Sequence, residues 1–410
     1  MKIAIFSDCY LDLTGGIVSS IAAQKSALET AGHTVYIFST SFPKPKAELR
    51  KLAKKNIFVV PSCWLFFRGL APVSRRPGVI EKWLLRTHPE LKDFDVFYVH
   101  YEAGCSIAGL RLARRLDIPS VQVMHGREDM GETNIIPFGF RTMVAIMLNW
   151  FHSWYLPHPI KIRRDDYLAD TIAKAKMWSI MVNHANHADL VLTPSAHFRK
   201  KLIHYGITSK IKVFPNGVSD SVFPAHPAVK SLELGAELKI VWHSRVSAEK
   251  RMMPFLQALK QVRGKYRLDV FGGGGDYFRA KRFSRRHHMN VVFHGNVKFD
   301  KLAKVIAEAH LDVLVSYNCD TFGMTLIEAE VYGTPVFFCD PDMQEIVPVG
   351  SYIMSSGTSP ATMATALNKI FEHPEQIRHM SETMLRHRSE VLMSKRIKIL
   401  EKYFNDIIKP

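Results

Sequence analysis

The most informative segment for chemistry is a ten-residue stretch, DTFGMTLIEA, which starts at Asp320 and contains a second acid at Glu328. It follows an apolar run and is expected to open a helix that ends at Gly333, before Pro335. At about 1.5 Å of rise per residue, eight helical positions separate the two carboxylates by about 12 Å. This separation is too large for two acids that flank one glycosidic bond, as a hydrolase pair would. The acids instead suit the two ends of a longer ligand.

The backbone between the two acids has the properties of an anion site. The first amides of the expected helix belong to four residues: Phe322, Gly323, Met324 and Thr325. The N–H groups of a first helical turn have no partner within the helix, and together with the positive end of the helix dipole they favour a phosphate. We therefore predict a sugar near Asp320, a pyrophosphate at the start of the helix and a ribose near Glu328.

The same segment resembles the E-x7-E motif of the large retaining glycosyltransferase family 4, whose usual form is E-x-F-G-x-x-x-x-E-A. The Phe322–Gly323 pair and Ala329 stand in register with that form, which argues against the alternative that Asp320 only caps the helix and Glu328 is only solvated. The sequence departs at the first acid, where Asp320 replaces Glu and draws the carboxylate back by about one bond length. The resemblance implies that Asp320 contacts hydroxyls of the donor sugar and that Glu328 contacts those of the ribose.

A second segment, VWHSRVSAEK over residues 241–250, resembles the family's G-R-x-x-x-E-K-G loop, with Ser244 and Arg251 in place of its glycines. The resemblance implies that Arg245 and Lys250 hold the donor pyrophosphate. An arginine offers a planar fork to phosphate oxygens, and a lysine offers a compact charge to the leaving group. If this loop is considered alone, the alternative is that Arg245 and Lys250 are ordinary exposed basic residues with no role in binding.

Four further residues are site candidates through the resemblance. Gly15 and Gly16 follow the first expected strand, where glycine lets the backbone approach a ligand, and family members carry a Gly-Gly pair there beneath the donor phosphates and the acceptor. His125 ends an expected strand and matches a family histidine that contacts the donor sugar. Asn296 falls where relatives make backbone contacts to the nucleotide base. A tight turn at the glycines and a structural role for His125 are the alternatives.

Neither a cofactor nor a metal is expected. Two Asp-x-Asp pairs, Asp93 with Asp95 and Asp340 with Asp342, do not adjoin the acids and cations named above, and no His or Cys cluster has ligand spacing. The glycine run 272–275 lacks the third glycine of a dinucleotide fingerprint. The resemblance implies catalysis without a bound metal, with retention by front-side substitution in which the leaving phosphate accepts the proton of the acceptor.

The sequence predicts two α/β domains that position these residues. At 410 residues and 47% hydrophobic, the chain can bury two cores, and apolar runs alternate with helical patterns on both sides of a stretch rich in proline and glycine. This alternation favours parallel sheets. The predicted parts are an N-terminal Rossmann-like domain (1–216), a linker (217–238), a C-terminal Rossmann-like domain (239–386) and a final helix (387–410). The resemblance implies the GT-B arrangement, in which the domains face each other across a cleft, the first domain serves the acceptor, the second binds the nucleotide sugar, and the last helix crosses back.

The composition limits the cellular compartments and the binding partners that are expected for this protein. The five cysteines lack a C-x-x-C pair and fit a reducing cytoplasm, and the N-terminal MKIAIFSDCY is expected to be a first strand, with no signal peptide. The longest apolar run, 143–156, is shorter than the roughly 20 residues of a spanning helix. The net charge of +17 suits nucleic acid, anionic lipid or a phosphorylated substrate. No recognised nucleic-acid-binding module occurs, so a nucleic-acid partner is not expected.

Two basic and aromatic stretches in the first half indicate an anionic membrane surface. Residues 44–86 hold eleven basic and two acidic residues, with interleaved Trp64, Phe66, Phe67 and Trp83. Residues 143–155 contain Trp150, Phe151, Trp154 and Tyr155 and are followed by Lys161, Arg163 and Arg164. Near anionic lipid each cation contributes on the order of 1 kcal/mol, and aromatic segments insert among headgroups. For the second stretch, a core helix followed by a solvated loop is the alternative.

The predicted activity is therefore transfer of a hexose from a nucleotide diphosphate sugar, with a UDP-sugar as the family default, to a membrane-associated acceptor such as diacylglycerol or another lipid. The predicted location is the inner face of the cell membrane, as a peripheral protein. Two alternatives remain open at this point: a transferase for a soluble polysaccharide or protein acceptor, and a degenerate fold that only binds.

Overall fold

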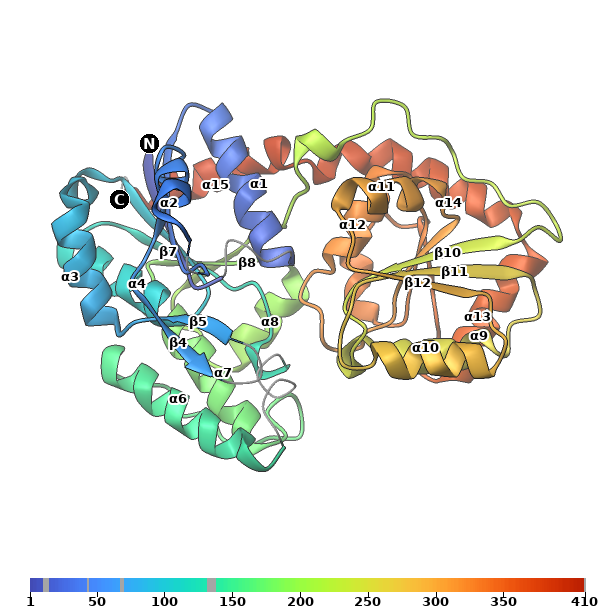
Figure 1. The fold of residues 1–410 in the computed structure, drawn as a ribbon, viewed down its shortest axis with the longest axis horizontal. Coiled ribbons are helices and arrows are strands. Elements are labelled where there is room, and N and C mark those ends of the chain that lie inside the picture. The colour runs from blue at the N-terminus through green and yellow to red at the C-terminus, as the bar shows by residue number, and fades with distance from the viewer. Residues whose placement is uncertain (10–14, 43, 67–69, 131–137, 409–410) are drawn as a thin grey trace. The chain divides into compact units, whose positions relative to one another are not determined.

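The computed structural model describes residues 1–9, 15–42, 44–66, 70–130 and 138–408. The chain forms two compact units, one of residues 1–215 with 396–410 and one of residues 216–395. Each unit is built around one parallel sheet with helices packed against it (Figure 1). The predicted α/β class with two Rossmann-like halves is confirmed. In the described residues no helix is both long and apolar enough to cross a membrane.

The first unit contains a seven-stranded parallel sheet in the order β3-β2-β1-β6-β7-β8-β9. Its strands are β1 (Lys2–Ser7), β2 (Thr34–Ser39), β3 (Ile57–Val59), β6 (Val96–His100), β7 (Ser120–Val123), β8 (Leu190–Thr193) and β9 (Lys210–Val213). A separate antiparallel pair is formed by β4 (Ser62–Phe66) and β5 (Leu70–Ser74). The strand order reverses between β1 and β6, and open α/β sheets bind ligands at the carboxyl ends of strands at such a point.

The helices of the first unit connect these strands. They are α1 (Gly16–Thr30), α2 (Lys46–Ala53), α3 (Pro77–Thr87), α4 (Gly104–Leu116), α6 (Arg141–Tyr155), α7 (Ile172–Ala185) and α8 (Ala196–His204). The last helix, α15 (Met393–Ile408), belongs to this unit from Arg396 onward. There the Phe404 ring lies 5.1 Å from that of Tyr98 in β6, and the Tyr403 hydroxyl donates to the Val213 carbonyl. The end of the chain is therefore part of the first core.

The second unit has a six-stranded parallel sheet in the order β12-β11-β10-β13-β14-β15. Its strands are β10 (Leu238–His243), β11 (Tyr266–Phe271), β12 (Val291–Gly295), β13 (Leu311–Leu314), β14 (Val336–Phe338) and β15 (Tyr352–Met354). Its helices are α9 (Met252–Leu259), α10 (Tyr277–Arg286), α11 (Phe299–Glu308), α12 (Met324–Val331), α13 (Pro360–Glu372) and α14 (Glu375–His387). Figure 1 shows α11 and α12 on one side of this sheet and α9, α10 and α13 on the other. Here the order reverses between β10 and β13.

Both faces of the second sheet are covered, which explains why its strands are almost continuously apolar. Trp242 in β10 joins Phe255 and Phe337 in one core cluster. Its neighbour Val241 joins Phe338 in the cluster on the opposite face. The central strands are thereby fixed from two sides, and their carboxyl ends are held in place for the site described below.

At Gly109, helix α4 packs closely against Phe6 of the first sheet. A Cβ at this position would lie 2.7 Å from Cγ of the fully buried Phe6, whereas a Cβ at Gly78 in α3 would meet nothing within 4 Å. We expect Gly109→Val to lower the unfolding temperature by about 5–10 °C, because overpacking a closed core costs about 1–3 kcal/mol. Gly78→Val is the matched control and should change it little. Calorimetric unfolding of both variants checks this, and equal shifts would contradict it.

Candidate active site

The candidate site of the second unit lies where its strand order reverses. His243 is the last residue of β10, and Asp312 lies on the neighbouring strand β13. Asp320 follows β13 in the loop before α12, and Glu328 lies within α12. The carboxyl ends of β10 and β13 therefore bring these four side chains to the edge at which parallel sheets bind ligands.

Lys250 and Asp320 form an ion pair at this edge, with 2.5 Å between Lys250 Nζ and Asp320 Oδ1. The Ser316 hydroxyl donates to the other oxygen of the carboxylate. Burial alone would lower the pKa of Lys250 and raise that of Asp320, but each charge stabilises the other. The net result is a raised pKa for Lys250 and a lowered pKa for Asp320, so both groups are charged at neutral pH. The structure thus brings two predicted site residues together.

Arg245 stands beside this pair on the segment that follows β10. Its side chain is 65% exposed, and its guanidinium lies 3.4 Å from Glu249. Burial raises the pKa of Asp320, whereas Lys250, Ser316 and, with a smaller effect, the positive charge of Arg245 lower it. The guanidinium is therefore close to the ion pair and accessible to an anionic ligand.

The glycine run after β11 supports the Arg245 segment. Gly272 has a φ of 116°, and a Cβ there would lie 2.3 Å from the Ser244 carbonyl oxygen. Gly274 has a φ of 149°, and a Cβ there would lie 2.4 Å from the Val246 oxygen. Only glycine lets the two loops pack this closely at these backbone angles. The run therefore positions the cationic loop, which the sequence pattern did not indicate.

The start of α12 differs from the prediction. The helix begins at Met324, so Phe322 lies before the first turn, and the prediction that its amide belongs to the helix is wrong. Asp320 lies in the loop before the helix, so helical rise does not give the distance between the two acids. The reason is Gly323, which has a φ of 69° and whose Cβ would lie 2.8 Å from Leu314. This left-handed glycine turns the chain and delays the helix.

The first turn of α12 still presents polar groups at the sheet edge. Its N-cap, Gly323, has no side chain to bond the amides of Met324 and Thr325. The Thr325 hydroxyl is buried and has no partner among the described residues. The side chain of Phe322, in contrast, is buried in the core. The backbone of this turn, with the threonine hydroxyl, is thus suited to an anion.

His243 connects Glu328 to a buried acid. Its Nε2 lies 2.5 Å from Asp312 Oδ2, and its Nδ1 lies 3.3 Å from Glu328 Oε2. Burial would lower the pKa of His243, but the attraction of Asp312 and Glu328 raises it to about 10. The imidazolium is therefore charged at neutral pH and donates to both carboxylates. Sequence reasoning missed both His243 and Asp312, although His243 lies only two residues before Arg245.

Asn296, a predicted site residue, and Asp340, which is not a predicted site residue, have separate places in this unit. Asn296 is exposed and follows β12, where its side chain would lie 3.8 Å from a Cβ at Gly273. Asp340 accepts the amides of Asn318, at 2.6 Å, and Asp342, at 3.1 Å, so it fixes the loop that leads to Asp320. In the part of the chain that the structure describes, no group of three His, Cys, Asp or Glu side chains could hold a metal ion.

His125 lies in the first unit and pairs with a histidine that the sequence did not single out. Its Nε2 is 2.7 Å from Nδ1 of His100, at the end of β6, so one ring donates and the other accepts. Burial lowers the pKa of His125 to about 4 and that of His100 well below its usual value. Both rings are neutral at neutral pH. His125 can therefore hydrogen-bond a sugar hydroxyl without bringing a charge.

Two acids at the same edge were also missed. The Asp8 carboxylate accepts the amides of Cys105, at 2.9 Å, and Ser106, at 3.0 Å, and so caps α4. Glu102 is buried, and burial, with the charges of Glu128 and Asp8, raises its pKa well above the usual value. Glu102 therefore holds its proton more firmly than an exposed glutamate does. Only their positions in the sequence could have indicated these two acids. Asp8 follows β1 and Glu102 follows β6, and the strand order reverses between these two strands.

The glycine pair lies at the start of α1, with Gly15 as its N-cap and Gly16 as its first residue. Gly15 has an extended backbone that any residue adopts, and a Cβ there would meet nothing within 4 Å. The packing of the protein itself does not require glycine at Gly15, so the predicted approach of a ligand stays a prediction. Leu13 and Thr14 of this loop lie outside the described residues, as do the side chains of Trp64, Phe66 and Phe67.

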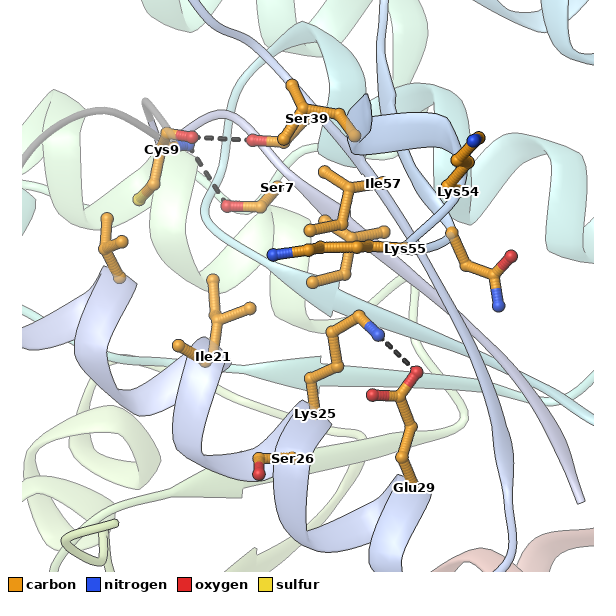
Figure 2. A pocket seen from close by; sticks show the side chains of 15 residues that line it. Ser7, Cys9, Ile21, Lys25, Ser26, Glu29, Ser39, Lys54, Lys55 and Ile57 are labelled. Carbon is orange, nitrogen blue, oxygen red and sulfur yellow. Dashed lines mark hydrogen bonds and ion pairs between the residues drawn. The ribbon is translucent and has the colours of Figure 1, made fainter. Parts of the chain in front are cut away.

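A cavity of about 490 Å³ lies beside α1 in the first unit. Figure 2 shows Ser7 and Cys9 near one end and the ion pair of Lys25 with Glu29 near the other. Its other lining side chains are mainly aliphatic, among them Val18, Ile21, Ile37, Leu52 and Ile57. The cavity thus combines an apolar wall with polar ends, as ligand sites commonly do.

Comparison with known families identifies the class of this protein. Residues 14–222 match the profile described as Glycosyltransferase Family 4, and residues 237–373 match the profile described as Glycosyl transferases group 1. The first match alone covers half of the chain. The chain therefore belongs to glycosyltransferase family 4 and is a glycosyltransferase, and the resemblance inferred from the DTFG segment is confirmed.

Individual relatives include enzymes named for glycolipid synthesis. The chain is 23% identical to the alpha-monoglucosyldiacylglycerol synthase of Streptococcus pneumoniae over 359 residues, which cover 82% of this chain and 70% of that protein. It is 31% identical to the sulfoquinovosyl transferase of Arabidopsis thaliana over 199 residues, 45% of this chain and 36% of that protein.

Solved structures confirm the GT-B fold class. The crystal structure of Anabaena HepE in complex with UDP superposes with a TM-score of 0.68 and 16% identity, over 99% of this chain and 100% of that chain. Sucrose-phosphate synthase from Thermosynechococcus elongatus superposes with a TM-score of 0.67 and 14% identity, over 99% of both chains.

The charge on His243 gives a test of the site. Because its pKa is raised to about 10, the imidazolium keeps its proton through neutral pH and loses it only as the pH rises through that value. We expect the histidine ring resonance that disappears in His243→Gln to keep one chemical shift from about pH 6 to about pH 8.5 in wild-type protein. In Asp312→Asn, the same resonance should titrate at lower pH. A wild-type His243 that titrates near its ordinary value would contradict this arrangement.

Proposed function

We propose that this glycosyltransferase moves a hexose from a UDP-sugar to a membrane lipid such as diacylglycerol, with retention of the anomeric configuration and without a bound metal. The observation that carries the proposal is the ion pair of Lys250 with Asp320, which lies beside Arg245 and before the first turn of α12. It places cations and an anion-binding helix start next to a carboxylate that can accept from hydroxyls.

The donor then occupies this edge of the second unit. Arg245, Lys250 and the first amides of α12 bind the diphosphate, because all three present positive charge or N–H groups. Asp320, which is charged, accepts hydrogen bonds from the sugar hydroxyls. Glu328, to which His243 already donates, accepts from the ribose hydroxyls. The UDP part of the proposal is supported by HepE, whose solved structures hold UDP and UDP-glucose.

Catalysis depends on the charge that develops when the sugar leaves. The bond from the anomeric carbon to the phosphate oxygen breaks, the bond to the acceptor oxygen forms on the same face, and the departing phosphate takes the proton of the acceptor. Lys250 and Arg245 stabilise the growing negative charge on that phosphate, a kind of contribution that is commonly the largest in enzymes. The raised pKa of Lys250 keeps the required proton on its amine. The cations take the part that a metal plays elsewhere.

The acceptor side belongs to the first unit in this proposal. The relatives from Streptococcus pneumoniae and Acholeplasma laidlawii are named as synthases of a glycosylated diacylglycerol. The aliphatic wall of the cavity beside α1 suits an apolar part of such an acceptor (Figure 2). The neutral His125 hydrogen-bonds the sugar or the acceptor hydroxyl. The protein then works as a peripheral protein on the inner face of the cell membrane, with anionic lipid and not nucleic acid as its partner.

Donor and acceptor can be tested together. Purified protein is incubated with several nucleotide sugars, with and without anionic vesicles that contain diacylglycerol, while nucleotide diphosphate and glycolipid are measured. We expect UDP release from one UDP-hexose, an alpha-linked glycolipid product, and little change on addition of a metal chelator. Product formed only on a soluble glycan would overturn the lipid acceptor. No turnover and no nucleotide-sugar binding with any donor would overturn the transferase itself.

Lys250 gives a sharper test of the mechanism. Removal of one group that stabilises charge in a transition state typically costs about 100-fold to 1,000-fold in kcat, and we expect a loss of this size for Lys250→Ala. Lys395→Ala is the matched control, because Lys395 also lies in the second unit and pairs with a carboxylate, Glu390, at 2.7 Å. Its kcat should match wild type. Equal losses in the two variants would show that Lys250 has no special role.

A further inference from the structure

Helix α6 (Arg141–Tyr155) packs against the first unit through one face only. On that face Ala145 and Leu148 contact Ala173 and Met177 of α7. His152, one helical turn beyond Leu148, is buried as well. Figure 1 shows α6 at the edge of its unit, with α7 beside it. The helix is therefore anchored to its own unit by its inner side chains.

The outer face of α6 is apolar and exposed. Five side chains on it are between 48% and 71% exposed: Met143, Ile146, Met147, Trp150 and Trp154. Their spacing of three and four residues places them on one side of a helix, opposite Ala145. The Trp150 and Trp154 rings lie 5.7 Å apart, so the two largest members touch. We call these five residues the α6 stripe.

A protein surface that faces only water does not explain a continuous apolar stripe of this kind. Single exposed apolar side chains are common on proteins, but a continuous apolar face marks a surface that binds something. Two adjacent tryptophans are typical of a membrane–water boundary, where an apolar ring and a polar N–H are both satisfied. At 15 residues the helix is about 22 Å long, short of the roughly 30 Å of a hydrocarbon core, so it suits a position in the plane of the boundary.

Arginines surround a cavity of about 390 Å³ at the carboxyl end of α6. Arg111, Arg114 and Arg115 of α4 line it together with Tyr155, the last residue of α6. Glu81 is the one carboxylate among the described residues that line it, and it pairs with Arg111 at 2.5 Å. Two of the three arginines thus add net positive charge to the cavity. A guanidinium group can donate two parallel hydrogen bonds to the oxygens of one phosphate.

We infer that the α6 stripe inserts into an anionic phospholipid surface and that the arginine cavity at its end binds the phosphate of a phospholipid headgroup. The two observations are independent, and each indicates one half of the same molecule. The stripe matches the acyl region, and the cavity matches the charged headgroup. Cationic residues that follow α6 in the sequence, Lys161, Arg163 and Arg164, add to the attraction and are all exposed. This inference rests on the proposed function, in which the acceptor is a membrane lipid.

The stripe is tested with vesicles of phosphatidylcholine that contain phosphatidylglycerol. We expect the double variant Trp150→Ser, Trp154→Ser to bind them about tenfold or more weakly than wild type, because the apolar area that enters the bilayer is lost. Phe278→Ser is the matched control, since Phe278 is an aromatic residue on helix α10 that is 80% exposed. The wild-type tryptophan emission should shift to the blue on binding, because the exposed rings of Trp150 and Trp154 leave water, whereas Trp178 and Trp242 are already buried. The double variant should lose most of this shift.

The cavity is tested through lipid preference. We expect Arg114→Glu, Arg115→Glu to reduce the preference for phosphatidylglycerol over phosphatidylcholine vesicles by about tenfold. Arg285→Glu, Arg286→Glu is the matched control, because both pairs lie in the last turn of a helix and both are exposed. An equal loss in the two double variants would show that general charge, and not this cavity, selects the lipid. Inorganic phosphate that competes as well as the vesicles would assign the cavity to free phosphate and overturn the lipid assignment.

Other outcomes separate this inference from the proposed function. UDP-glucose binding, measured by calorimetry, should be the same in wild type and in all four variants. Wild-type protein that binds UDP-glucose but no vesicles would overturn the inference and leave the donor assignment intact. Protein that binds vesicles through α6 but no nucleotide sugar would overturn the proposed function alone. A wild-type dimer that the tryptophan variant converts to monomer, without vesicle binding, would assign the stripe to a second copy of the chain.

Discussion

The ion pair of Lys250 with Asp320 is the interaction on which the proposed donor site depends. Two charges that lose most of their contact with water are costly unless they are paired and hydrogen-bonded, and here each supplies what the other needs. The pair also joins the segment after β10 to the segment after β13. In the proposed function, an incoming diphosphate therefore meets a lysine that is already positioned and charged.

His243, at the end of β10, is a second cation that is paired with acids. It stands between Asp312, which is fully buried, and Glu328, which is partly exposed. Together Lys250 and His243 hold both acids of the DTFGMTLIEA segment to β10 through charged contacts. Gly323 makes this possible, because its left-handed backbone turns the chain between the two acids. A segment fixed at both ends needs little reorganisation when a ligand binds, which favours stabilisation of a transition state.

The sequence was sufficient for the parallel sheets and for the acids and cations of the DTFG and VWHSR segments, because apolar runs and local motifs carry that information. It was not sufficient for the contact of His243 with Asp312. Those residues are 69 positions apart and meet only because β10 lies next to β13, which strand order decides. The pairing of His125 with His100 was missed for the same reason. The late start of α12 was missed because the helical pattern does not reveal the backbone angle of Gly323.

The candidate sites of the two units are built from different interactions, charged pairs in the second unit and apolar surfaces in the first. This difference affects how the substrates of such an enzyme can change. In the second unit the side chains around the donor site are held by charged pairs, and loss of one partner leaves a buried charge. In the first unit the features assigned to the acceptor are apolar surfaces, the cavity beside α1 and the α6 stripe, where substitutions of similar volume are tolerated. The apolar pattern of α6 was readable from the sequence, but periodicity shows only which residues share a face, and not whether that face is covered. Under the proposed assignment of acceptor and donor to the two units, changes of acceptor can thus arise on the first unit without disturbing the charged pairs of the second.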